Sequence, residues 1–161
     1  MKLNFIRALA LFFGAYIIVT ILAVATTECY DLIVNPPPAA PGVSPVKAPV
    51  FLATVPFHVL IMLIIWPLFA AIYFKNARAK NLNEERSETL SLAFLWLVLA
   101  ITVDFVGFVW IKSPFSLSEH AFYVDYQPWI SLIYLAIFLS PWIWLTLSKR
   151  GSKKQTAKIR R

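Results

Sequence analysis

Residues Leu90–Ile111, LSLAFLWLVLAITVDFVGFVWI, decide the fold of this chain. The run is apolar apart from two hydroxyl side chains and one carboxylate, that of Asp104. A helix rises 1.5 Å per residue, so a run of this length crosses the roughly 30 Å of hydrocarbon in a bilayer. Backbone polar groups find no water there, and the run is therefore predicted to be a transmembrane helix.

Three similar runs occur elsewhere in the 161 residues, of which 60% are hydrophobic and only 14% charged. So few charges cannot cover the surface of a soluble domain of this size. We expect an all-α integral membrane protein, an antiparallel four-transmembrane-helix bundle with spans at about 5–26, 50–74, 89–111 and 129–147. Residues 1–148 then form one membrane domain. Residues 149–161 form a basic cytoplasmic tail, which its composition predicts to be disordered.

The basic residues give the predicted orientation. Thirteen of the fifteen lie at the two ends of the chain and in the middle loop: Lys2, Arg7, Lys75, Arg78, Lys80, Arg86, Lys149, Arg150, Lys153, Lys154, Lys158, Arg160 and Arg161. Only Lys47 and Lys112 lie in the other two loops. The positive-inside rule then places both termini in the cytoplasm of a multi-pass protein. Compact size and short loops favour the plasma membrane of a bacterium, its inner membrane.

The first run has a second interpretation. Lys2 and Arg7, an apolar stretch and the small residues Ala23-Val24-Ala25 resemble a secretory signal. Cleavage would leave three spans. The run is long for a signal, and the sequence leaves open whether the first span is retained.

The two outer loops differ in composition. Residues 26–49 contain six prolines and are predicted to be an extended, stiff segment. The second loop contains the capping-box pattern Ser116-Leu117-Ser118-Glu119, followed by amphipathic residues. We expect a short interfacial helix there, ended by Pro128.

Asp104 is the most informative single residue, because a carboxylate within a span costs on the order of 3 kcal/mol and usually faces the bundle interior. Ala93, Ala100 and Gly107 lie on the same stripe of its helix. Small residues permit close helix contact. Asp104 is therefore expected to face another helix.

His58 is its expected partner. It lies eight residues inside Val50, and Asp104 lies eight residues before Lys112, so both are predicted about 12 Å below the outer boundary. Thr54 lies one turn from His58 on the same face. With the second and third helices as antiparallel neighbours, we expect a His58–Asp104 hydrogen bond. It is either a structural pair that sets helix register or part of a proton- or ligand-binding site.

The outer rim carries a second set of polar candidates: Glu28, Asp31, Glu119, His120, Tyr123, Asp125 and Tyr126. His120 and Asp125 are five residues apart and are expected to diverge on an α-helix. Glu119, Tyr123 and Tyr126 are expected to share a face. This set is either a solvated rim or an acid–base site acting on a lipid headgroup.

These features support three hypotheses about function. The first is a non-enzymatic accessory or interaction subunit of an envelope or transport assembly. The second is a proton- or cation-linked transporter or ligand-binding membrane protein that uses Asp104 and His58. The third is an outer-interface lipid-modifying enzyme that uses Glu119, His120 and Asp125. Because no catalytic motif is visible, the sequence favours a protein that is not an enzyme.

Expected partners follow from the same composition. They are the lipid bilayer, anionic lipids at the basic tail, and a membrane protein partner or a homo-oligomer. The net charge of +7 resides at the ends of apolar runs rather than on a folded face, so we expect no nucleic acid. Cys29 is the only cysteine, and no metal or cofactor motif accompanies it, so we expect neither a metal nor a cofactor.

Overall fold

The computed structural model describes residues 3–75, 82–112 and 116–159, with side chains described up to Lys149 except for that of residue 82. Its four long helices are α1 (Phe5–Val34), α2 (Pro49–Phe74), α3 (Leu82–Asp104) and α4 (Trp129–Ile159). Three short helical segments are η1 (Pro45–Lys47), η2 (Phe105–Trp110) and η3 (Ala121–Asp125). The all-α prediction is confirmed, and all four helical regions are long and apolar enough to cross a membrane. Five of the cations used to predict orientation lie outside the described residues: Lys2, Arg78, Lys80, Arg160 and Arg161.

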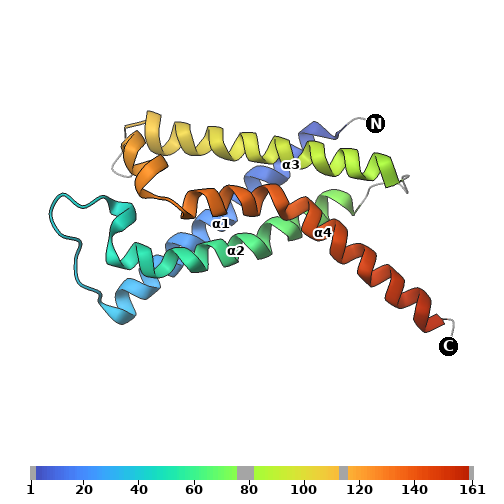
Figure 1. Cartoon of the computed structure of the whole chain (residues 1–161), viewed down its shortest axis with the longest axis horizontal. Coiled ribbons are helices and arrows are strands. Elements are labelled where there is room, and N and C mark those ends of the chain that lie inside the picture. The colour runs from blue at the N-terminus through green and yellow to red at the C-terminus, as the bar shows by residue number, and fades with distance from the viewer. Residues whose placement is uncertain (1–2, 76–81, 113–115, 160–161) are drawn as a thin grey trace.

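Consecutive helices run in opposite directions, so both chain ends lie at the same end of the bundle (Figure 1). We call this the tail end, and the opposite end, which carries residues 35–48, 111–112 and 116–128, the loop end. α2 packs against α1 and α4, and α3 packs mainly against α4. α2 and α3 are therefore diagonal in the bundle, and the expectation that they are close neighbours is wrong. A short connection permits two helices to adjoin but does not require it.

α1 is longer than expected, because it continues through residues assigned above to the first outer loop. The hydroxyls of Thr26 and Thr27 donate to the carbonyls of Leu22 and Ala23, so these side chains bond within the helix. No proline interrupts the helix before residue 36. α1 ends where Asn35 adopts a left-handed conformation and its N–H donates to the carbonyl of Asp31.

The core of the tail end is built from aromatic rings and small residues. Phe12, Trp66 and Trp96 come from three different helices, with ring centroids 5.5 Å apart for Phe12–Trp66 and 5.3 Å apart for Trp66–Trp96. The Trp96 indole N–H donates to the carbonyl of Ala8 at 3.0 Å. This bond brings α3 onto α1, and Ala8 and Ala100 are fully buried as such close approach requires.

A polar cluster closes the tail end. The Tyr73 hydroxyl accepts from the backbone N–H of Asn4 at 3.1 Å and donates to Glu88 at 3.0 Å. The Arg7 guanidinium donates to the carbonyl of Ile72 at 2.6 Å and lies over the Tyr73 ring. Tyr73 thus connects the ends of α1, α2 and α3.

α3 changes its winding after Asp104. In the π-helical segment η2, the N–H of Ile111 donates to the carbonyl of Val106, five residues back. This wider turn rotates the following side chains relative to an α-helix. Ala93, Ala100 and Asp104 are buried, as the stripe predicted, but Gly107 is exposed, and a β-carbon added to it would have no neighbour within 4 Å. The inclusion of Gly107 in the contact stripe is therefore wrong.

A short helix lies in the second loop. It covers residues 119–125, and the side chain of Ser118 caps it by accepting a hydrogen bond from the N–H of Ala121. In the structure, α4 continues through residues 150–159 of the predicted tail as one helix to Ile159 and projects from the bundle (Figure 1).

Candidate functional site

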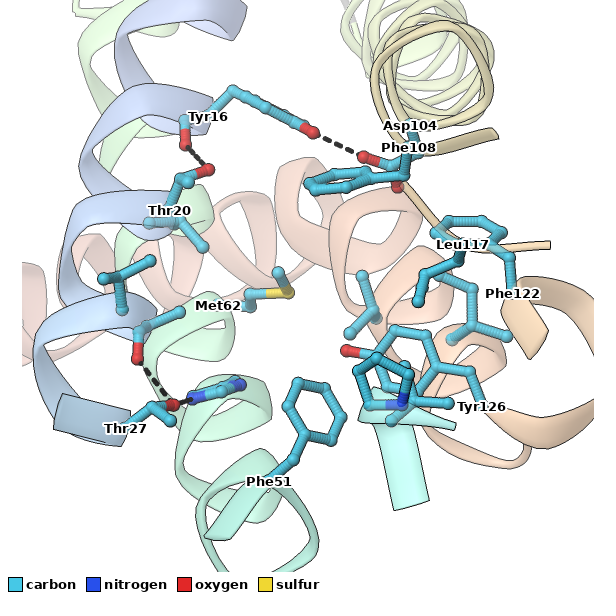
Figure 2. Close-up of a pocket in the computed structure, with 18 of the residues that line it drawn as sticks. Tyr16, Thr20, Thr27, Phe51, Met62, Asp104, Phe108, Leu117, Phe122 and Tyr126 are labelled. Atoms are coloured by element: carbon cyan, nitrogen blue, oxygen red, sulfur yellow. Dashed lines mark hydrogen bonds between the residues drawn. The ribbon is translucent and has the colours of Figure 1, made fainter. Parts of the chain in front are cut away.

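A cavity of about 440 Å³ lies in the loop-end half of the bundle (Figure 2). All four long helices, η1, η2, η3 and the chain before η3 contribute to its wall. Most of the wall is apolar, with a few polar groups facing inward. The lining residues are Tyr16, Val19, Thr20, Ala23, Val24, Thr27, Glu28, Pro45, Val46, Phe51, His58, Met62, Trp66, Asp104, Phe108, Ser116, Leu117, Phe122, Tyr126, Ile130, Ile133 and Ile137.

Asp104 lies at this wall and is only 7% exposed. The Tyr16 hydroxyl donates to Asp104 Oδ1 at 2.5 Å, reaching across from α1 (Figure 2). The buried hydroxyl of Tyr134 on α4 interacts with the same carboxylate but makes no hydrogen bond of good geometry with it. Asp104 therefore faces the bundle interior, as its helix predicted.

His58 belongs to a separate polar group on the α1–α2 side of the cavity. Its Nε2 lies 3.1 Å from Thr27 Oγ1, and this hydroxyl lies 3.2 Å from Thr54 Oγ1. Thr54 also donates to the carbonyl of Val50 at 2.9 Å. Thr54 is fully buried and His58 is 6% exposed, so this group is shielded by the protein.

The expected His58–Asp104 hydrogen bond is therefore replaced by two separate bonds to α1. Asp104 bonds to Tyr16, and His58 bonds to Thr27. The diagonal placement of α2 and α3 is the physical reason, because each of the two side chains bonds to α1 rather than to the other. His58 and Asp104 nevertheless line the same cavity, which is consistent with their equal predicted depth.

Sequence reasoning missed the contribution of α1. Tyr16, Thr20, Ala23 and Thr27 are spaced i, i+4, i+7 and i+11, which places them on one helix face. All four line the cavity. The hydroxyl side chains at three of these four positions, within an otherwise apolar run, were the available signal.

At the rim, an ion pair joins the two loops. Lys47 of η1 donates to Asp125 of η3 at 2.6 Å, and His120 Nδ1 lies 3.6 Å from the same oxygen. Their bonding, chiefly that of Lys47, lowers the pKa of Asp125 below its usual value. The expectation that His120 and Asp125 diverge is wrong. η3 is π-helical, and a five-residue spacing matches its hydrogen-bond period.

The other rim candidates separate from one another. Tyr126 turns into the cavity, where its ring makes an edge contact with Phe51 at 5.3 Å. Burial, and then the nearby Asp104, raises the pKa of Tyr126. Glu119 and Tyr123 are exposed instead and do not line the cavity, so the three residues do not share one environment. Glu28 and Asp31 are both exposed, but Glu28 lines the cavity and Asp31, one turn further along α1, does not.

Two buried donors near the cavity make no hydrogen bond within the described part of the chain. One is the indole N–H of Trp66, whose side chain is 1% exposed and forms part of the lining. The other is the Tyr134 hydroxyl beside Asp104. Unpaired buried polar groups are uncommon and require an explanation.

Comparison with known proteins finds no matching family model, no similar curated protein and no similar solved structure. Residues 3–75, 82–112 and 116–159 contain no group of three or more His, Cys, Asp or Glu side chains arranged to hold a metal. The cavity and its polar groups are therefore the basis on which a function is proposed.

Proposed function

We propose that this protein spans a membrane four times and binds a small amphipathic molecule in the cavity between its helices. The cavity itself is the observation that carries this proposal. Its volume of about 440 Å³ lies within the range of roughly 300–1,000 Å³ typical of ligand pockets. Such pockets combine apolar walls with a few convergent polar groups, and this one has Asp104–Tyr16 on one side and His58–Thr27 on another.

Asp104 and His58 are proposed as the cation- or proton-sensitive groups of this site. An ionisable residue within a transmembrane region is by default a functional candidate. Hydroxyls of α1 bond to both side chains, Tyr16 to Asp104 and Thr27 to His58. A ligand that enters between α1 and the other helices would therefore alter the two hydrogen bonds together. This arrangement supports ligand binding, or transport linked to a proton or cation, more than a purely structural pair.

The proposed orientation places the tail end in the cytoplasm and the cavity toward the outer leaflet. The distribution of lysines and arginines supports this, because thirteen of fifteen belong to the tail-end segments by sequence. Alkaline phosphatase fused after Lys149 is expected to be inactive in a bacterial host, and fused after Val43 to be active. The reverse pattern would overturn the orientation.

Binding is tested by filling the cavity. Ala23 lines it, whereas Ala25 is exposed on the outside of the same helix. We expect protein in phosphatidylcholine nanodiscs to bind dodecanol saturably, Ala23→Phe to lose this binding, and Ala25→Phe to keep it. Equal binding by both variants would place any dodecanol in the lipid rather than in the cavity and would contradict the proposal.

A second candidate function, an accessory subunit of a membrane assembly, is favoured by the helical arm of α4. α4 extends beyond the apolar span, which ends at Lys149, as far as Ile159. A basic arm of this kind suits a cytoplasmic partner or anionic lipid. Removing residues 150–161 is expected to abolish co-purification of a partner in mild detergent and to leave dodecanol binding intact. The hypothesis of a lipid-modifying enzyme at the rim stays a prediction.

A further inference from the structure

We propose that the occupant of the cavity is a lipophilic amine, a single hydrocarbon chain with a protonated amino group that pairs with Asp104. This inference rests on the proposed ligand-binding function and specifies its chemical class. Three features of the site lead to it: the charge of the lining, the aromatic rings and the size of the cavity.

The lining favours a cation. It contains two carboxylates, those of Asp104 and Glu28, and one imidazole, that of His58. Within the described residues it contains no lysine or arginine. An anionic amphiphile such as a fatty acid would meet two carboxylates and no lysine or arginine in this lining, and no lysine or arginine of the described residues pairs with the buried carboxylate of Asp104.

Asp104 retains capacity for such a partner. A carboxylate offers about four acceptor positions, and the Tyr16 hydroxyl occupies one of them. The Tyr134 hydroxyl lies beside the same carboxylate, and counting it as a second donor still leaves about two acceptor positions. An ammonium group in the cavity would neutralise the buried charge and occupy acceptor positions on its free side.

Aromatic rings surround the same space. Phe51, Phe108, Phe122 and Tyr126 line it, and Figure 2 shows Phe108 directly beside Asp104. The negative faces of aromatic rings attract ammonium groups, with contributions of roughly 0.5–2 kcal/mol per contact. A carboxylate in a cavity that is lined by several rings therefore favours an organic cation over a neutral molecule of the same length.

The volume limits the rest of the molecule. About 440 Å³ is in the lower part of the range of roughly 300–1,000 Å³ typical of ligand pockets. This size favours one amine-headed chain of about twelve carbons over a complete two-chain phospholipid. A phosphatidylethanolamine headgroup carries the same ammonium group. The free amine and the lipid differ in the size of the rest of the molecule.

The experiment compares three twelve-carbon probes that differ only in their head. Radiolabelled dodecylamine, dodecanol and dodecanoate are titrated against the full chain in phosphatidylcholine nanodiscs. We expect dodecylamine to bind at least tenfold more tightly than dodecanol, and dodecanoate not to compete. Equal affinity for the amine and the alcohol would overturn the inference that the ligand is an amine, and the proposed ligand-binding function would still stand. Absence of saturable binding by every probe would overturn both.

Asp104→Asn tests whether the ammonium group pairs with Asp104. It is expected to reduce the affinity for dodecylamine about tenfold more than the affinity for dodecanol, and the saturable dodecanol binding that remains shows that the variant is folded. Unchanged dodecylamine binding would overturn the pairing with Asp104. If the variant does not fold, the amine–alcohol comparison on the unaltered protein decides.

A final arm tests the lipid source. Nanodiscs that contain phosphatidylethanolamine are expected to bind dodecylamine as tightly as those made of phosphatidylcholine alone. Loss of dodecylamine binding in the presence of phosphatidylethanolamine would overturn a free amine as the occupant, because the headgroup would then fill the site.

Discussion

The two halves of the bundle are built from the same four helices but are packed in different ways. At the tail end, the rings of Phe12, Trp66 and Trp96 fill the space between helices that approach through alanines. At the loop end, hydroxyls, aliphatic side chains and aromatic rings leave a cavity of about 440 Å³ between the helices. Trp66 belongs to both, since it is packed in the core and also lines the cavity.

The contrast has a local cause in α3. As far as Asp104 this helix is α-helical and presents Ala93 and Ala100 to its neighbours. Beyond Asp104 it becomes π-helical, and its side chains rotate away from that stripe. π-helical turns are rare and are found frequently at functional sites. The tail-end half is thus filled by packed side chains, and the loop-end half contains the cavity.

The largest expected effect comes from breaking the tail-end core. Trp96→Ala removes a fully buried ring and the hydrogen bond to the carbonyl of Ala8. Large-to-small changes of this kind cost about 3–5 kcal/mol. We expect a loss of this size in the free energy of unfolding, measured by denaturant titration in mixed micelles. Trp110→Ala is the control, since Trp110 is 70% exposed, and an equal loss in both variants would contradict the contrast between the two halves.

The next effect concerns the polar bond across the cavity. Tyr16→Phe leaves Asp104 without its hydroxyl donor. Hydrogen bonds to charged groups contribute about 1.5–3 kcal/mol. We expect a stability loss of this order, and a much smaller additional loss when Asp104→Asn is already present. Tyr123→Phe, at an exposed position, should have no effect; strictly additive losses for Tyr16 and Asp104 would show that the two side chains are not coupled.

A smaller effect distinguishes exposed Gly107 from buried Ala100, which the sequence placed on the same stripe of the third span. Gly107→Ala adds a methyl group where no atom lies within 4 Å. Because alanine is favoured over glycine in helices by up to about 1 kcal/mol, the variant is expected to be as stable as the parent or slightly more stable. Ala100→Leu, at a fully buried position, is expected to destabilise the protein. Destabilisation by Gly107→Ala would instead show that Gly107 packs against another helix.

The smallest effect is that of the ion pair between the loops, and it depends on pH. The pKa of Asp125 is lowered in the folded state, so its contribution is complete above the unfolded value of about 3.9 and is lost as pH falls through the lower folded value. Lys47→Met is therefore expected to accelerate hydrogen exchange in η1 and η3 at pH 7. The ratio of variant to parent exchange should approach one as Asp125 becomes protonated. A ratio that does not change with pH would show that Lys47 acts without Asp125.

Some features of the site were predictable because they depend on local pattern alone. The burial of Asp104 followed from its position within an apolar helix beside Ala93 and Ala100. That Asp104 and His58 line one cavity is consistent with the equal depth obtained by counting residues from the ends of their helices. The identity of their partners did not follow, because it depends on which helices adjoin. Two helices joined by a short connection here lie on a diagonal.

The amino-acid sequence by itself determined the four long apolar helices and the concentration of basic residues in the terminal and middle segments. Both are consequences of hydrophobicity and charge along the chain, which need no knowledge of contacts. Only the tertiary structure decided that His58 and Asp104 bond to α1 instead of to each other, that η3 brings His120 to Asp125, and that the loop end contains a cavity. These depend on the packing order of the helices and on two π-helical turns. Their energies arise from many weak contacts between distant residues, which no single segment of sequence encodes.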